Sequence, residues 1–204
     1  MKKALAITLE KLEGFEKPKI KLEQYVTPPS LAAEIVVNAK LIGDLNFVVD
    51  LGCGTGILAI ASCLLNAKAI GIDVDLDALK IAKRNAAEFG VSGKVDFIVC
   101  DVKKFVLKLK SEKSLTTIMN PPFGIQRRHA DRPFLIKAME ISNVIYTMHS
   151  AGSEKFVKKM CDENDFKITH LWKYKIPLKK TYSFHEKEFK YIACLLYTSP
   201  SPRD

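Results

Sequence analysis

Three glycines at alternate positions, Gly52, Gly54 and Gly56, follow directly on a short apolar run at residues 47–51. Such a run is typical of a strand that is buried on both faces of a parallel sheet. Glycine allows the backbone to turn tightly and to approach a ligand closely. Residues 57–66 then have the pattern of a helix, so this segment predicts the strand, turn and helix that begin a doubly wound α/β fold.

Strands and helices are expected to alternate through most of the remaining chain. The segment Thr27-Pro28-Pro29 is typical of a helix start. This alternation predicts a mostly parallel sheet with helices on both faces, and the last two strands are expected to pair antiparallel as a hairpin. Further strands are expected at residues 69–73, 95–100, 115–119, 144–149, 168–176 and 189–196, and further helices at 76–89, 102–109, 133–141 and 154–161.

Acidic residues stand at the ends of two of the expected strands. Asp73 ends the strand at 69–73, and Asp101 follows the strand at 95–100. An acid after the second strand of such a fold can accept hydrogen bonds from ribose hydroxyls, and a polar residue after the third can accept from an adenine amino group. Asp75 is interpreted instead as the N-cap of the helix that follows it.

The tetrapeptide Asn120-Pro121-Pro122-Phe123 follows the expected strand at 115–119. Pro121 and Pro122 have a fixed φ and each restricts the preceding residue, so the segment is a stiff turn. The Asn120 side-chain oxygen and the Pro121 carbonyl can accept hydrogen bonds from an amino group on a planar ring, and Phe123 offers a face for base stacking. A simple turn after a strand is the alternative interpretation, because short motifs match by chance.

The order of these motifs resembles the class I S-adenosylmethionine-dependent methyltransferases that act on amino nitrogens. Over residues 11–192 the chain further resembles one subfamily, the methyltransferase-like N6-adenosine methyltransferases of small-subunit ribosomal RNA found in eukaryotes and archaea. Val26 stands where many relatives have proline. The segments that carry the resemblance are residues 14–19, 22–25 with Thr27, 50–54, 73–75, 100–102, 120–124 and 183–185.

The resemblance implies a seven-stranded Rossmann-like sheet with the strand order 3-2-1-4-5-7-6, and S-adenosyl-L-methionine as the methyl donor. It also implies base capture by Asn120, Pro121, Pro122 and Phe123. A small zinc-binding activator subunit is implied as a partner, and the expected edge strand near Lys94–Val99 could accept a strand from it. The cofactor-binding residues that it implies are Gln24, Tyr25, Thr27, Asp50, Gly52, Cys53, Gly54, Gly56, Asp73, Asp101, Val102 and Asn120.

The formal net charge of +9 favours binding to a polyanion. Basic residues follow the Asn-Pro-Pro turn, and others are interleaved with aromatic residues in the last third of the chain, as is typical of RNA contact. For the lysines an ordinary solvated face is an equal alternative. The expected RNA-binding residues are Arg127, Arg128, Arg132, Lys173, Lys179 and Lys180.

The five cysteines are scattered and form no Cys-x-x-Cys pair, so neither a metal site nor a disulfide framework is expected. Apolar runs are too short to cross a membrane, and no signal peptide is indicated, so a cytoplasmic protein is expected. Residues 1–194 are expected to form a single methyltransferase domain, in which residues 1–46 are a helical, cofactor-capping segment. Residues 195–204 resemble a non-native tail, because prolines interrupt the strand pattern there.

Three functions therefore remain open. The first is N6-methylation of an adenosine in RNA, with ribosomal RNA of the small subunit as the expected substrate. The second is methylation of another amino group, such as guanine N2, a DNA adenine or a protein glutamine amide. The third is a non-catalytic RNA-binding protein that has kept the cofactor fold.

Overall fold

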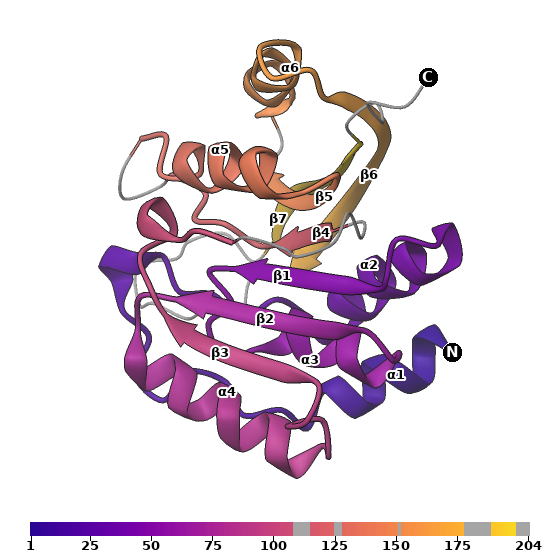
Figure 1. Cartoon of the computed structure of the whole chain (residues 1–204), viewed down its shortest axis with the longest axis vertical. Coiled ribbons are helices and arrows are strands. Elements are labelled where there is room, and N and C mark those ends of the chain that lie inside the picture. The colour runs from indigo at the N-terminus through magenta and orange to yellow at the C-terminus, as the bar shows by residue number, and fades with distance from the viewer. Residues whose placement is uncertain (108–114, 125–127, 151, 178–188, 199–204) are drawn as a thin grey trace.

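The computed structural model describes residues 1–107, 115–124, 128–150, 152–177 and 189–198; of residues 175–177 and 189–198 it describes the backbone alone. A central sheet with helices on both faces forms the molecule (Figure 1). Its elements, in chain order, are α1 (Lys2–Leu9), the 3-10 turn η1 (Ile20–Leu22), α2 (Pro29–Ile42), β1 (Phe47–Leu51), α3 (Ile57–Leu64), β2 (Lys68–Asp73), α4 (Leu76–Glu88), β3 (Val95–Val99), the 3-10 turn η2 (Val102–Lys104), β4 (Leu115–Met119), α5 (Arg132–Ile141), β5 (Val144–Ser150), α6 (Glu154–Asp162), β6 (Lys167–Pro177) and β7 (Phe189–Thr198).

The seven strands lie in the order β3-β2-β1-β4-β5-β7-β6, which confirms the strand order expected from the resemblance. Strand β1 pairs parallel with β2 on one side and β4 on the other, and the β2–β3 and β4–β5 pairs are also parallel. Strand β7 pairs antiparallel with both β5 and β6, as expected for a C-terminal hairpin. The predicted fold class, a mostly parallel doubly wound sheet, is therefore confirmed.

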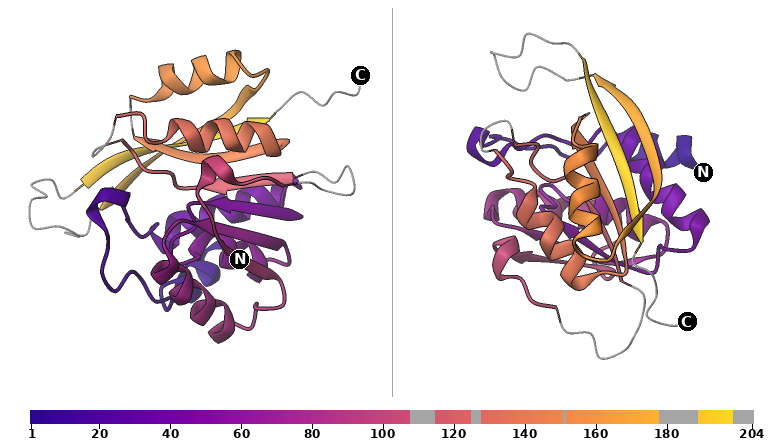
Figure 2. Two further views of the ribbon diagram at one scale, coloured as in Figure 1. Left: turned by 60° about the vertical axis from the view of Figure 1, so that its left-hand side comes forward. Right: turned by 90° about the horizontal axis from the view of Figure 1, so that it is seen from above.

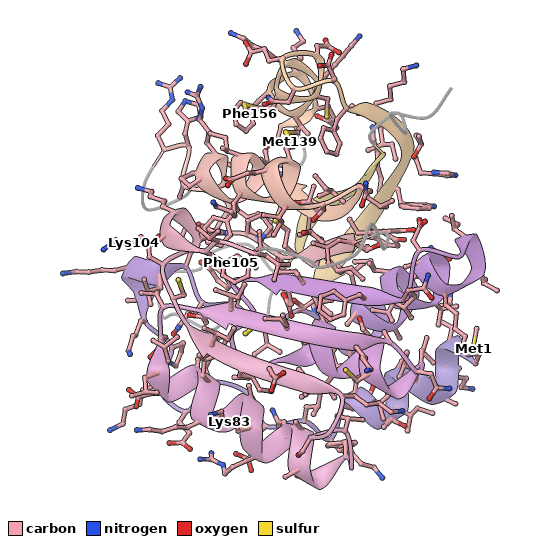
Figure 3. The ribbon with its side chains drawn as sticks, in the orientation of Figure 1. Met1, Lys83, Lys104, Phe105, Met139 and Phe156 are labelled. Carbon is pink, nitrogen blue, oxygen red and sulfur yellow. The ribbon has the colours of Figure 1, made fainter. Side chains whose placement is uncertain are left out.

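Two hydrophobic clusters, one on each face of the sheet, explain which helices cover it. The first joins buried residues of α1, α2 and α3 to alternate sheet residues such as Val48 and Ile118. The second joins α5 and α6 to the opposite sheet residues, such as Val49 and Met119. Figure 2, in its view from above, shows α1 and α2 on one side of the C-terminal strands and α5 and α6 on the other. Figure 3 shows Met139 and Phe156 of the second cluster close together where α5 meets α6.

The expected helix at residues 102–109 is wrong. The described part of that segment is a single 3-10 turn, in which the Asp101 carboxylate accepts a hydrogen bond from the Lys103 amide at 2.9 Å. Phe105 then has an extended backbone and is buried in the second hydrophobic cluster. Burial of this ring in an extended segment outweighs the helical spacing of the local sequence.

Strand β7 continues through residues 195–198, where Tyr197 pairs with Ile145 and Thr198 with Val144. These residues belong to the segment that resembles a non-native tail, and residues 199–204 lie outside the described part of the chain. The strand pairing does not test whether residues 195–204 are native to this protein, so their non-native origin stays a prediction. In the part of the chain that the structure describes, no helix combines the length and the apolar character that a membrane span requires.

Candidate active site

A cavity of about 450 Å³ lies at the carboxyl ends of the central strands. This is where ligands bind in open α/β sheets, because the loops after adjacent strands diverge there. In Figure 1 the arrowheads of β1 and β2 point toward the indigo segment that closes this end of the sheet. Of the residues predicted from the sequence, Gln24, Tyr25, Thr27, Asp50, Gly52, Cys53, Gly54, Asp73, Asp101, Val102, Asn120, Pro122 and Arg128 line the cavity.

Some predicted site residues do not line the cavity. Gly56 is the N-cap of α3, and Phe123 packs against the first hydrophobic cluster. Arg132 begins α5, and Lys173 is exposed on strand β6. Pro121 is buried beside Asn120 outside the cavity lining. Arg127, Lys179, Lys180 and residues 183–185 lie outside the described residues.

The glycine turn after β1 has left-handed backbone conformations, with φ of 74° at Gly52 and 53° at Gly54. Both glycines also meet an aromatic ring. A Cβ atom at Gly52 would lie 2.9 Å from Cε1 of Phe134, and one at Gly54 would lie 2.7 Å from Cζ of Phe15. Glycine is therefore required at these positions by the backbone conformation and by the close approach of the rings.

Phe15 and Phe134 also line the cavity, and neither was among the site residues predicted from the sequence. Phe15 lies within the segment 14–19 that carries the family resemblance, and this was the one available signal for it. Phe134 follows Pro133 in the first turn of α5, and no local sequence pattern indicates its contact with the glycine turn.

The Asp73 carboxylate at the end of β2 is hydrogen-bonded to the glycine turn. Asp73 accepts hydrogen bonds from the amides of Gly54 and Asp75, each at 2.8 Å. Burial raises the pKa of the Asp73 carboxyl above its ordinary value, although these amide hydrogen bonds oppose the shift. The carboxylate thus holds the turn to the end of β2, and its remaining lone pairs can accept bonds from a ligand.

Asp50 has one carboxylate oxygen, Oδ1, that is buried without a hydrogen-bond partner among the described residues. Its other oxygen accepts from the amide of Ala59 at 3.1 Å, in the first turn of α3. Burial raises the pKa of the Asp50 carboxyl to about 8, and the Ala59 hydrogen bond only partly opposes this shift. A buried acid with an unsatisfied oxygen at a cavity wall suits a cationic ligand, which would supply the missing partner.

The segment before α2, residues 13–27, crosses the cavity and is held to α4 at two places. Asn85 bonds the backbone amide and carbonyl of Glu13, at 2.9 and 3.0 Å. Asp75, confirmed as the N-cap of α4, accepts from Lys19 Nζ at 2.6 Å and from Gln24 Nε2 at 2.7 Å. Burial would raise the pKa of Asp75, but these hydrogen bonds outweigh it and hold that pKa below its ordinary value.

Both ends of the Gln24 side-chain amide are hydrogen-bonded. Its Nε2 donates to Asp75, and its Oε1 accepts from the Lys19 backbone amide at 2.7 Å. Gln24 therefore lies at the cavity wall as predicted, with its oxygen and nitrogen both bonded to protein groups. The close contacts of this residue in the structure are with the segment that crosses the cavity and with the N-terminus of α4. A ligand contact of Gln24 stays a prediction.

Asn120 lies at the cavity wall immediately after β4. Its Nδ2 donates a hydrogen bond to the Thr27 hydroxyl at 3.0 Å. Its Oδ1 is buried and receives no hydrogen bond from the residues that the structure describes. Asn120 therefore lies at the cavity wall as predicted, and the role of its oxygen as an acceptor for an amine stays a prediction.

The loop before α5 adds Arg128, His129, Pro133 and Phe134 to the cavity wall. His129 has a left-handed backbone with φ of 60°, and its ring lies 5.5 Å from that of Phe156. A buried pair anchors this loop to the carboxyl end of β5.

In that pair, Asp131 Oδ2 lies 3.2 Å from Nδ1 of His149, and Nε2 of His149 lies 3.1 Å from the Thr147 hydroxyl. His149 is 1% exposed, so the whole arrangement is shielded from water. The sequence analysis did not identify this pair, because its members are 18 residues apart and belong to no motif.

No cluster of three or more His, Cys, Asp or Glu side chains within the described ranges could hold a metal ion. The cysteines whose side chains are described, Cys53, Cys63, Cys100 and Cys161, are free.

Comparison with known proteins identifies relatives along nearly the whole chain. The family model for ribosomal protein L11 methyltransferase (PrmA) matches residues 34–114, which include the glycine turn and β1 to β3. The uncharacterized protein MJ0284 of Methanocaldococcus jannaschii is 40% identical over 96% of this chain and 92% of its own length. The rRNA N(6)-adenosine-methyltransferase METTL5 of Danio rerio is 33% identical over 91% of this chain and 92% of its own.

The corresponding Drosophila melanogaster protein, also named as an rRNA N(6)-adenosine-methyltransferase, is 34% identical over 90% of this chain and 89% of its own. Among solved structures, PH1948 from Pyrococcus horikoshii is 41% identical and covers 97% of both chains with a TM-score of 0.88.

Proposed function

The chain belongs to the family of rRNA N(6)-adenosine-methyltransferases, and from this we propose that it transfers a methyl group from S-adenosyl-L-methionine to the N6 amine of an adenosine in ribosomal RNA. Within this proposal we expect small-subunit ribosomal RNA to be the substrate. We also propose a cytoplasmic location, and a single domain spanning residues 1–194.

The observation that carries the proposal is the Asn120 side chain at the wall of a cavity large enough for a small-molecule ligand. Its amide nitrogen is occupied by Thr27, and its buried Oδ1 is left to accept a hydrogen bond from a bound molecule. A buried acceptor without a partner is costly, so an amino group that donates to it is strongly favoured there.

The chemistry follows from what this acceptor does to an aromatic amine. The lone pair of the adenine amine is delocalised into the ring, so the nitrogen is a poor nucleophile until it pyramidalises. Asn120 Oδ1 would accept one amine hydrogen and favour that geometry, and the motif assigns the other hydrogen to the carbonyl of Pro121, which lies beside Asn120 outside the cavity lining. The two prolines keep both acceptors in place before the amine arrives. The proton that the methylated amine loses can pass to solvent.

S-adenosyl-L-methionine supplies an electrophilic methyl group on a sulfonium cation. The residues around the glycine turn fit such a group: the turn exposes backbone, Asp50 offers an unpartnered buried oxygen, and Asp73 keeps lone pairs for hydroxyls. We assign the adenosine end of the donor to Asp73, Asp101 and Val102, which line the same cavity. Tyr25 and Cys53 line the same cavity and complete the proposed donor site.

Donor binding is expected to release a proton from Asp50. With a pKa of about 8 this carboxyl is mostly protonated at pH 7, and a bound cation favours its ionised form. Asp50 should therefore lose up to one proton per donor bound at pH 7, and donor affinity should rise as pH approaches 8.

Calorimetry in two buffers with different ionisation enthalpies measures this proton release. Asp50→Asn is the matched variant, since it keeps the shape of the side chain and cannot ionise. It should bind the donor more weakly and release less than a third as many protons. Equal proton release by the wild type and by Asp50→Asn would show that Asp50 does not face the cation.

For the RNA we propose contacts from Arg128 at the cavity, from Arg132 at the start of α5, and from Lys173 on β6, supported by the net positive charge. Arg127, Lys179 and Lys180 complete the proposed set.

We propose a small zinc-binding activator subunit as a partner that adds a strand to the edge of the sheet at β3. Strand β3 is at the end of the strand order, and Ile98 and Val99 on it are 40% and 52% exposed. An edge strand with exposed apolar side chains is a template for pairing with another chain.

Co-expression with the activator should raise the soluble yield and the donor affinity. Val99→Asp should reduce both gains by at least about fivefold, because a charge would be buried against the partner. Val106→Asp, at an apolar residue that is 67% exposed outside β3, is the control and should keep them. If the two variants behave alike, the partner does not bind at β3.

The function is tested by incubating the protein with methyl-labelled donor and with ribosomal RNA, DNA or ribosomal protein, followed by nucleoside analysis. Label in N6-methyladenosine of ribosomal RNA is the expected result. The proposal is falsified if label appears only in protein, only in DNA or as methylguanosine. The match to the ribosomal protein L11 methyltransferase model ends at residue 114, before Asn120, so the matched segment does not include the proposed substrate site.

A further inference from the structure

We propose that Asn85 is a positioning residue for the methyl donor, because its buried side-chain amide joins two segments that form one wall of the cavity. The amide binds Glu13, in the segment that crosses the cavity, and Thr55, in the glycine turn. Asn85 is fully buried and does not itself line the cavity, so it acts through these neighbours. The inference rests on the proposed function, since it concerns binding of the donor that this function requires.

Three hydrogen bonds use both ends of the Asn85 amide. Oδ1 accepts from the Glu13 backbone amide at 2.9 Å, and Nδ2 donates to the carbonyls of Glu13 and Thr55, each at 3.0 Å. A backbone amide only donates and a backbone carbonyl only accepts, so all three partners specify the same orientation of the side chain. Turning the amide over would place donor against donor and acceptor against acceptor. Asn85 therefore holds Glu13 and the glycine turn in one defined arrangement.

The partners of Asn85 lie beside the contact between Phe15 and Gly54. Glu13 is two residues before Phe15, and Thr55 directly follows Gly54. A Cβ atom at Gly54 would lie 2.7 Å from Cζ of Phe15, so the ring comes close to the turn. Phe15, Gly54 and Thr55 all line the cavity. The amide and the ring thus join the same two segments at adjacent points, and together they fix the shape of this wall.

Helix α4 gives this joint a rigid base. Asn85 belongs to its buried face together with Ala82, three residues earlier. A Cβ atom at Gly56 would lie 3.1 Å from the Cβ of Ala82, so the helix lies directly against the glycine turn. A wall that is already fixed loses little entropy when a ligand binds to it. Without the joint, the donor would have to order both segments itself, and its affinity would fall.

Three variants separate this role from general stability. Asn85→Leu removes all three hydrogen bonds with a side chain of similar size. Arg84→Ala is the matched control, because Arg84 holds the same segment through exposed ion pairs, one of them with Glu13 at 2.7 Å. Thr117→Val loses a different buried hydrogen bond, between the Thr117 and Ser142 hydroxyls, outside the cavity lining.

Donor affinity by calorimetry is the first measurement, at a temperature where melting curves show each variant to be folded. Asn85→Leu is expected to raise the Kd for S-adenosyl-L-methionine at least about tenfold and to keep kcat at saturating donor within about threefold. Arg84→Ala and Thr117→Val should keep the Kd within about threefold, since exposed ion pairs contribute little. An unchanged Kd in Asn85→Leu overturns the inference. An equal loss in Arg84→Ala overturns it too, because holding the crossing segment would then be sufficient.

Hydrogen exchange of the Gly54 amide gives a readout that depends on no reaction. This amide donates to Asp73 at 2.8 Å, and that acceptor is unchanged in every variant. Asn85→Leu should raise its exchange rate at least about tenfold because the turn is released, whereas Arg84→Ala and Thr117→Val should not. Unchanged exchange in Asn85→Leu would mean that Asn85 does not hold the turn, which overturns the inference.

The wild-type protein provides the test if Asn85→Leu does not fold. Saturating donor should slow exchange of the Glu13 and Gly54 amides by factors that agree within about threefold, and more than it slows the Leu115 amide, which binds Asn143 on β4. Slowing of only one of the two overturns the inference. If affinity and exchange respond as expected but adenosine is not methylated, the proposed function fails and the role of Asn85 stands. If adenosine is methylated and Asn85→Leu keeps its donor affinity, the inference alone fails.

Discussion

Replacing Asn120 by alanine should lower the rate of methyl transfer about a thousandfold and change the donor Kd less than about threefold. The variant removes an acceptor that is aimed in advance at the amine, and the loss of one such group typically costs two to three orders of magnitude in rate. Donor binding should persist because the glycine turn, Asp50 and Asp73 belong to β1 and β2, and Asn120 shares only the cavity with them. Single-turnover kinetics and calorimetry measure the two quantities separately.

Asn143→Ala is the matched control for this variant. Asn143 precedes β5 and accepts a hydrogen bond from the Leu115 amide at 3.1 Å, at the opposite end of β4 from Asn120. Its loss should lower the melting temperature and leave the transfer rate unchanged. Loss of donor binding in Asn120→Ala would mean that Asn120 belongs to the donor site, which would contradict the separation of roles proposed for the cavity.

Gly54→Val should weaken donor binding by at least about a hundredfold, corresponding to roughly 3 kcal/mol. The residue has a left-handed backbone that a branched side chain strongly disfavours, and its added Cβ would lie 2.7 Å from the Phe15 ring. The turn or the ring must move, and both line the cavity. Donor calorimetry, together with a melting curve to establish that the variant folds, is the measurement.

Three further variants separate backbone strain from the contact with the ring. Gly90→Ala is strained in the same way, with φ of 67°, but its Cβ would meet nothing within 4 Å, so it should keep donor affinity. Phe15→Ala combined with Gly54→Ala should bind the donor more tightly than Gly54→Ala alone if the contact with Phe15 causes the loss. No recovery in the double variant would assign the loss to the backbone conformation.

The cavity shows why some site residues were predictable and others were not. Gly52, Gly54 and Asn120 were found because glycine permits, and proline restricts, backbone conformations within a few residues. Asp75 was predicted correctly as an N-cap for the same reason, since the acceptor and the amide that it caps are two residues apart.

Contacts between distant segments were not predictable in this way. Phe134 was missed although its ring limits what can stand at Gly52. The Asp131–His149 pair was missed because neither residue stands in a motif. The expected helix at 102–109 failed because burial of Phe105 in the second hydrophobic cluster outweighs local helical spacing.

Local backbone chemistry and apolar periodicity were therefore sufficient to predict the doubly wound sheet, and family resemblance added the order of its strands. The sequence alone also placed the glycine turn and the Asn-Pro-Pro turn at the ends of their strands. The tertiary structure was needed to bring Thr27 to Asn120, Gln24 to Asp75 and Phe15 to Gly54. These contacts join segments that meet only after the helices have packed on the sheet, so their geometry depends on the packing of the whole domain rather than on any local pattern.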